Sequence, residues 1–282
     1  MKKGINIWSF PEGRPILECA KLAKKAGFDG IELSLNESGE LGLETTEQEA
    51  MALRQNIADL GLEISGLATG QYWANWMTSD SEEVRNKAID ICRKQLETAA
   101  ALGSDAILVI PGAVGVDFIP GCDVIDYEKA YDRALEAMRK LAPAAEQSGV
   151  AIGIENVWNK FLLSPLELRQ FIDTVGSPYV GSYFDVGNVV HSGYPEHWIR
   201  ILGNRIKKVH FKDYRRQAGG LHGFVDLLAG DVNYPAVMQA FKDIGYDGYV
   251  TAEMIPNYNH HTEQIIFNTS ASMDVILGRT VL

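Results

Sequence analysis

The chain has 282 residues, of which 46% are hydrophobic and 22% are charged, a composition typical of globular proteins and unlike that of disordered or collagen-like chains. Its 26 Lys and Arg residues against 37 Asp and Glu leave a formal net charge of −11, which argues against sequence-independent binding to nucleic acid. Three cysteines without CxxC spacing, the lack of a secretory h-region and the lack of a membrane-spanning apolar stretch predict a cytoplasmic protein with no disulfide framework and no membrane partner.

Short apolar runs alternate with helix-like segments along the chain. Each of seven glycines follows a helix-like segment and precedes an apolar run. Glycine is a common residue at the end of a helix. These glycines are Gly27, Gly61, Gly103, Gly149, Gly176, Gly203 and Gly245. With residues 3–8 at the start, the runs cover residues 29–33, 62–67, 105–110, 150–154, 179–184, 206–209 and 247–252.

Three of the intervening segments show apolar residues on one side of a helix, as expected for helices that lie on a sheet. Thr46 and Glu49 have the spacing of a capping box before the first of them, and Ser79 and Glu82 have it before the second. Pro235 suits the first turn of the third.

Strands buried on both faces read as continuous apolar runs, so the eight runs predict parallel strands joined by helices. Since no linker or low-complexity tract divides them, we expect a single (β/α)8 barrel that spans residues 1–282. A doubly wound fold is the alternative, although no glycine-rich phosphate-binding fingerprint follows any of the runs.

Active sites of such barrels lie at the carboxyl ends of the strands. Four successive strands end in polar residues that can bind metal: Glu155, Asp185, His210 and Glu253. Three carboxylates at one mouth would repel each other unless a cation lay among them. This donor set predicts one divalent ion, most suitably Mn²⁺ or Mg²⁺, with Co²⁺, Ni²⁺ or Zn²⁺ as acceptable alternatives.

Other polar residues near strand ends are candidates for substrate contacts. Lys212, Arg215 and Arg216 follow the seventh strand and could bind phosphate or form a solvated basic patch, and His222 lies farther along the same segment. For Asn6, Trp8 and Glu32, at the ends of the first two strands, a supporting role is as good an interpretation as substrate contact. Trp73 and Trp76 either wall a sugar pocket or cap the barrel, whereas His197, His260 and His261 are expected to be exposed.

The four strand ends read IEN, FDVGN, VHFKD and AEM, at residues 154–156, 184–188, 209–213 and 252–254. These motifs resemble those of the sugar phosphate isomerase/epimerase family of xylose-isomerase-like barrels. The resemblance is greatest to L-ribulose-5-phosphate 3-epimerases and, more distantly, to D-tagatose/D-psicose 3-epimerases. It implies that Glu155, Asp185, His210 and Glu253 hold the metal and that the two glutamates also transfer protons. Asn188 stands where free-ketose epimerases have His, which favours the pentulose-phosphate branch.

The activity that this resemblance implies is epimerisation of a ketose or ketose phosphate at C3 through a cis-enediolate. Inversion requires one carboxyl group to take a proton and another to deliver one on the opposite face. Aldose–ketose isomerisation, dehydration of a cyclic polyol, a metal-dependent phosphodiesterase and a non-catalytic sugar-binding barrel are the alternatives. Assembly into a homo-oligomer stays open at this point.

Overall fold

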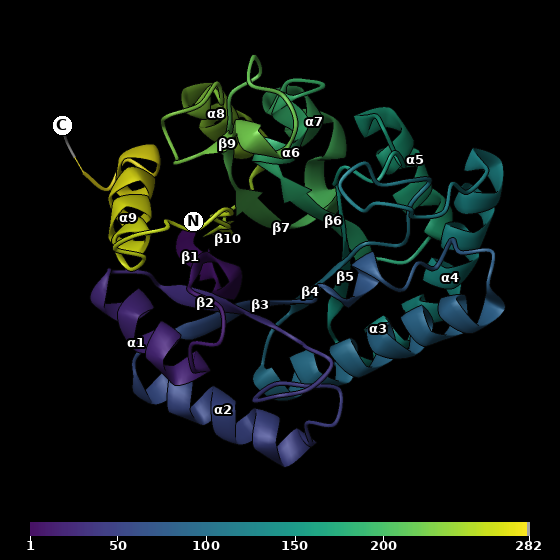
Figure 1. The fold of residues 1–282 in the computed structure, drawn as a ribbon, viewed down its shortest axis with the longest axis horizontal. Coiled ribbons are helices and arrows are strands. Elements are labelled where there is room, and N and C mark those ends of the chain that lie inside the picture. Colours follow the sequence, from purple (N-terminus) through teal and green to yellow (C-terminus); the bar gives the residue numbers. More distant parts are fainter. Residues whose placement is uncertain (281–282) are drawn as a thin grey trace.

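Eight parallel strands form a closed barrel in the computed structural model, which describes residues 1–280 (Figure 1). Around the ring the order is β1-β10-β7-β6-β5-β4-β3-β2, so the first and last barrel strands pair with each other. The barrel strands are β1 (Lys2–Asn6), β2 (Gly30–Ser34), β3 (Glu63–Ala68), β4 (Ala106–Val109), β5 (Ala151–Glu155), β6 (Val180–Asp185), β7 (Ile206–Phe211) and β10 (Tyr249–Ala252). The predicted (β/α)8 barrel is confirmed, and each predicted strand overlaps an observed one.

Helices surround the barrel, and Figure 1 shows them as an outer ring around the strands. They are α1 (Ile16–Lys25), α2 (Glu47–Asp59), α3 (Glu82–Leu102), α4 (Tyr127–Ser148), α5 (Pro165–Val175), α6 (Val186–Val190), α7 (Pro195–Leu202), α8 (Tyr234–Ile244) and α9 (Gln264–Ile276). None of the helices within residues 1–280 combines the length and apolar character needed to cross a membrane.

The helix starts follow capping chemistry, with one correction to the sequence prediction. Thr46 and Glu49 form the predicted capping box of α2. The box predicted for Ser79 and Glu82 is wrong, because Ser81 is the N-cap of α3 and accepts a hydrogen bond from the Val84 N–H. Ser79 instead accepts from the N–H of Ser81, so its hydroxyl organises the turn before the helix.

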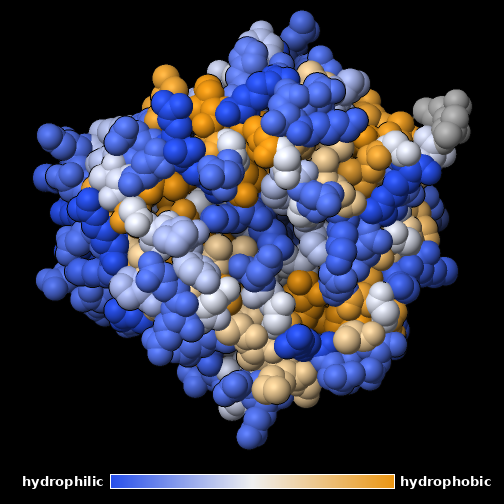
Figure 2. Space-filling model, turned by 180° about the vertical axis from the view of Figure 1, so that it is seen from behind, coloured by the Kyte–Doolittle hydropathy of each residue, from blue (hydrophilic) through white to orange (hydrophobic). Residues whose placement is uncertain are grey.

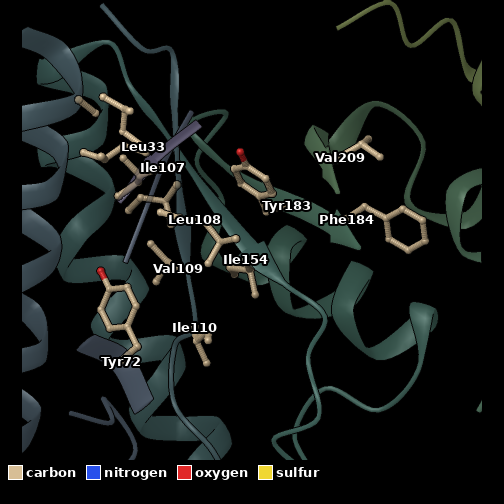
Figure 3. Packing of buried hydrophobic residues seen from close by; sticks show 14 of the residues in the cluster. Leu33, Tyr72, Ile107, Leu108, Val109, Ile110, Ile154, Tyr183, Phe184 and Val209 are labelled. Atoms are coloured by element: carbon tan, nitrogen blue, oxygen red, sulfur yellow. The ribbon is translucent and has the colours of Figure 1, made fainter. Parts of the chain in front are cut away.

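Apolar side chains fill both the barrel interior and the layer between strands and helices. Successive residues of a strand point to opposite faces, as Tyr183 and Phe184 of β6 do in Figure 3. Tyr183 points into the barrel, where its ring lies 4.9 Å from that of His210. Phe184 packs outward, with its ring 6.4 Å from that of Trp198 in α7.

At the amino-terminal end of the barrel, Asp29 ties three parts of the chain together. Its carboxylate accepts hydrogen bonds from the Lys3 N–H at 2.7 Å and from the Arg279 guanidinium at 2.8 Å. Burial acts to raise the pKa of Asp29, but these two donors outweigh it and hold the pKa below its usual value.

On the outer surface, hydrophilic residues cover most of the face opposite to that in Figure 1, with smaller apolar patches between them (Figure 2).

A small antiparallel hairpin follows β7 at the carboxyl end of the barrel, formed by β8 (Asp213–Tyr214) and β9 (Phe224–Val225). The carboxylate of Asp213 organises the segment beyond it, because it accepts hydrogen bonds from the N–H groups of Leu228, Gly230 and Val232. One buried side chain thus fixes the course of the loop that leads from the barrel mouth to α8.

Candidate metal centre

The structure brings together the four residues that the sequence singled out. Glu155 ends β5, Asp185 ends β6, His210 lies in β7 and Glu253 directly follows β10. Each offers one ligand atom, and these four atoms all lie within 4.8 Å of one another. All four residues are buried. Three oxygens and one nitrogen converging at this separation form a cluster that could hold a metal ion.

The unsatisfied atoms of the cluster test whether a metal ion fits. Asp185 Oδ2, His210 Nδ1 and Glu253 Oε2 are buried and lack a hydrogen bond of regular geometry within residues 1–280, although Lys212 forms ion pairs with the two oxygens. Buried polar atoms normally have hydrogen-bond partners, and exceptions need an explanation. Because all three atoms face the same point and are of the types that divalent cations accept as ligands, the residues fit a metal ion.

Lys212 reaches the same point from the chain segment directly after β7. Its Nζ lies 3.1 Å from Asp185 Oδ2 and 3.0 Å from Glu253 Oε2. Burial acts to lower the pKa of the ammonium, but the surrounding carboxylates outweigh it and raise the pKa above its usual value. The lysine is therefore charged and lies among the metal-ligand candidates, whereas the sequence analysis considered it for phosphate binding.

Glu32 lies behind His210 on the side away from the other carboxylates. Its Oε2 is 2.7 Å from His210 Nε2, and its carboxylate also accepts hydrogen bonds from Asn6 Nδ2 and the Tyr183 hydroxyl. Since a carboxylate only accepts hydrogen bonds, Nε2 carries a proton, which it donates to Glu32. Nδ1 is then directed at the metal-ligand candidates, 2.8 Å from Glu253 Oε2.

Two asparagines hold the ends of β5 and β6 together. Asn156 donates to the Asp185 carbonyl at 2.8 Å and accepts from the Asp185 N–H at 2.9 Å. The Asn188 N–H donates to Asp185 Oδ1 at 2.8 Å. Its side-chain amide donates to the Asn156 carbonyl at 3.0 Å and lies 3.4 Å from Glu155 Oε1. Asn188 therefore touches the cluster directly.

The two glutamates have opposite pKa shifts. Burial raises the pKa of Glu155 to about 8, against an opposing effect of Lys212. For Glu253 burial acts in the same direction, but Lys212 and His210 outweigh it and bring the pKa to about 2. Two carboxyl groups in one cluster thus prefer different protonation states, which is the arrangement that acid–base pairs use.

The remaining predicted residues of the β7 segment lie farther from the cluster. Arg215 is exposed and its Nε donates to the Ala229 carbonyl. Arg216 donates to the carbonyls of Val190 and Gly193, and its guanidinium lies 4.6 Å from the centroid of the Tyr194 ring. His222 is exposed, as are His197, His260 and His261.

Two clefts flank the barrel mouth. One, of about 710 Å³, is lined by Trp8, Ser34 and Asn36 from the ends of β1 and β2. The other, of about 510 Å³, is mainly apolar and includes Asn156 and Asn188. Trp73 stands edge-on to Phe118 of the neighbouring loop at 5.1 Å, and Trp76 is buried beneath with its Nε1 donating to the Trp73 carbonyl.

Sequence reasoning missed Tyr183 and the central position of Lys212. The signal was present in the strand periodicity, because residues two apart on a strand share a face. Tyr183 precedes Asp185 by two positions, and Lys212 follows His210 by two.

Comparison with known proteins identifies relatives of the chain by sequence. The chain is 24% identical over 263 residues to the putative L-ribulose-5-phosphate 3-epimerase SgbU of Haemophilus influenzae, a match that covers 90% of this chain and 88% of that protein. It is 27% identical over 181 residues to the uncharacterized protein MJ1311 of Methanocaldococcus jannaschii, covering 62% of this chain and 59% of that protein.

Solved structures of similar fold include D-psicose 3-epimerase with D-tagatose from Clostridium cellulolyticum H10 and the IOLI protein with a bound zinc atom. Each superposes with a TM-score of 0.81 at 18% sequence identity. The first covers 99% of both chains, and the second covers 100% of this chain and 99% of its own. Residues 20–270, most of the chain, match the sequence profile of the xylose isomerase-like TIM barrel family. The chain therefore belongs to the xylose isomerase-like TIM barrel family.

Proposed function

We propose that the protein is a metal-dependent isomerase that epimerises a ketose or ketose phosphate at C3. The observation that carries this proposal is the convergence of Glu155, Asp185, His210 and Glu253 at the carboxyl ends of four adjacent strands. Sugar epimerases among its relatives and structural neighbours support the same activity.

Glu155, Asp185, His210 and Glu253 would hold one divalent ion, with Mn²⁺ the first choice for three oxygens and one imidazole. Mg²⁺, Co²⁺, Ni²⁺ and Zn²⁺ remain alternatives that metal replacement distinguishes. When bound, the ion acts as a Lewis acid that stabilises the negative charge developing on the substrate oxygens. Around it, Glu32 orients His210, while Asn156 and Asn188 fix the separation of the two strand ends.

The residues that transfer protons at C3 are Glu155 and Glu253. They come from strands that are separated in the barrel by β6 and β7. One takes the C3 proton to give the cis-enediolate, and the other returns a proton to the opposite face. Each can do so because a positioned carboxyl group is an effective general acid or base. The configuration of the substrate decides which glutamate is the base.

For the substrate we propose a ketose phosphate ahead of a free ketose. Asn188 supports this choice, as do Arg215, Arg216 and His222 in the segment after β7, a region where barrels of this type often bind phosphate. Asn6 and Trp8 remain candidates for contacts on the opposite side of the mouth, beside the cleft at the ends of β1 and β2. In this proposal the partner is a small sugar rather than a nucleic acid.

Proton NMR in D₂O tests the proposal directly. The metal-free protein is reconstituted with Mn²⁺ and incubated with a panel of ketoses and ketose phosphates. The Mn²⁺ is removed from each sample before its spectrum is recorded. Loss of the C3 proton signal together with appearance of the C3 epimer is the expected result. Exchange at C1 would assign aldose–ketose isomerisation instead, and metal binding without exchange on any substrate would favour a sugar-binding barrel.

A further inference from the structure

Lys212 places a second kind of cation at the point where the metal-ligand candidates meet. Its Nζ contacts Asp185 Oδ2 and Glu253 Oε2 at 3.1 and 3.0 Å. Within residues 1–280 neither oxygen accepts a hydrogen bond of regular geometry, and both belong to the metal-ligand candidates. An ammonium group at this position and a divalent ion bound by the same oxygens would therefore interact with the same negative charge.

The surroundings of Lys212 show that its stem is tightly seated. Gly187 of α6 lies against it so closely that a Cβ at Gly187 would be 2.4 Å from the Lys212 Cβ. The Phe224 ring of β9 lies with its centroid 5.6 Å from Nζ. Only 12% of the side chain is exposed. The ammonium is thus surrounded by carboxylates and an aromatic ring rather than by solvent.

Electrostatics gives this arrangement a consequence for metal binding. Three carboxylates in a buried cluster repel one another unless a positive charge compensates them. Lys212 supplies one positive charge from within the chain, so the carboxylates need not all be protonated when no metal is bound. A divalent ion must then bind against the repulsion of a nearby ammonium.

We propose that Lys212 is the internal counter-cation of the cluster and competes with the divalent ion for Asp185 and Glu253. It stabilises the metal-free barrel and weakens metal binding, so the bound ion stays exchangeable. The inference rests on the proposed function only in its requirement for a metal ion at this cluster. It involves no substrate.

Calorimetric titration of Mn²⁺ into the EDTA-treated, dialysed full-length protein tests the competition. The variants are Lys212→Met and, as a second substitution, Lys212→Gln. Lys208→Met is the matched control, because Lys208 is a buried lysine of β7, the strand that directly precedes Lys212, and its Nζ pairs with Asp105 at 2.6 Å. Circular dichroism and thermal melts with and without Mn²⁺ accompany each titration.

We expect both Lys212 variants to bind Mn²⁺ at least about tenfold more tightly than the wild type, because a like charge beside the ion has been removed. Their metal-free melting temperatures should fall, and the rise on adding Mn²⁺ should exceed that of the wild type. Lys208→Met should bind Mn²⁺ with wild-type affinity.

Equal or weaker Mn²⁺ binding by a folded Lys212 variant would overturn the competition while leaving the metal-dependent function intact. If neither Lys212 variant folds even with Mn²⁺ present, the ion does not replace the charge of Lys212 and the proposed competition is wrong. If the wild type binds neither Mn²⁺ nor Zn²⁺, both the metal-dependent function and this inference are wrong.

Discussion

Nε2 of His210 lies 2.7 Å from Oε2 of Glu32, although 178 residues separate the two along the chain. Glu32 is on β2 and His210 is on β7, strands that are not neighbours in the sheet. The contact therefore crosses the barrel interior. A carboxylate behind a histidine of a metal site fixes the ring orientation and the position of its proton.

Replacing Glu32 by Gln should weaken metal binding about 10- to 100-fold, the usual effect of losing such an outer carboxylate. Gln keeps the shape but loses the negative charge that orients the imidazole. Calorimetric titration of Mn²⁺ measures the change, and nitrogen-15 NMR of His210 reports whether Nε2 still carries the proton. Unchanged affinity in a folded variant would contradict an orienting role for Glu32.

Glu155→Gln and Glu253→Gln should each reduce turnover by at least about 10²- to 10⁴-fold, since each removes a proton carrier. The assay is exchange of the C3 proton in D₂O with Mn²⁺ in excess. Glu63→Gln serves as control, because Glu63 starts β3 at the opposite end of the barrel, where it pairs with Lys2. Near-wild-type exchange by either active-site variant would refute the two-glutamate mechanism.

Arg215→Ala and Arg216→Ala should raise KM for the phosphorylated ketose far more than for the free sugar, because both guanidinium groups lie on the segment proposed to bind phosphate. Steady-state kinetics on matched sugar pairs measures the difference. Arg200→Ala is the control, since Arg200 pairs with Asp243 on the outside of the barrel. Equal effects on both substrates, or better kcat/KM for the free ketose in the wild type, would return the assignment to a free-ketose epimerase.

Gly66→Ala should destabilise the protein. A Cβ at Gly66 would lie 2.4 Å from the Tyr183 hydroxyl oxygen and 2.7 Å from Glu32 Oε1, and overpacking of this kind costs about 1–3 kcal/mol in the free energy of unfolding. Denaturant unfolding measures the loss. In a Tyr183→Phe background the substitution should cost less, because the nearest oxygen is gone. An equal cost in both backgrounds would contradict this explanation.

The stability difference between wild type and Asp29→Asn should depend on pH. The pKa of Asp29 is lower in the folded protein than the 3.8 that is usual for an aspartate, so its ionised form stabilises the fold above that value. This contribution disappears as the pH falls through the folded-state pKa. Thermal melts should therefore show wild type more stable at neutral pH and the two proteins converging once the pH is below the folded-state pKa. A gap that persists in acid would indicate a loss of packing instead.

Much of the architecture could be predicted from the sequence. Parallel strands are buried on both faces, which makes each of them an apolar run, and Thr46 with Glu49 marks the start of α2 by local chemistry. Glu155 and Asp185 could be placed together because adjacent strand ends meet at one mouth.

Contacts that depend on three-dimensional closure could not be predicted in the same way. Nothing near Glu32 in the sequence indicates that it meets His210, because that contact requires the ring of strands to close. Ser81 was missed as the cap of α3 because Ser79 also has suitable spacing, and only the path of the turn distinguishes them. Lys212 was expected to bind phosphate or to lie in a solvated basic patch, because it follows a metal-ligand candidate together with Arg215 and Arg216 in a chain of net charge −11.

All four metal-ligand candidates come from β5, β6, β7 and β10, which are consecutive around the ring. The remaining strands contribute Glu32 and its hydrogen-bond donor Asn6, while Trp8 after β1 and Phe118 after β4 line the two clefts. The first half of the barrel, β1 to β4, can thus be varied separately from the second half, β5 to β7 with β10. In the proposed epimerase, loops of the first half can be redesigned to vary the size of the sugar while the metal-ligand candidates of the second half stay constant.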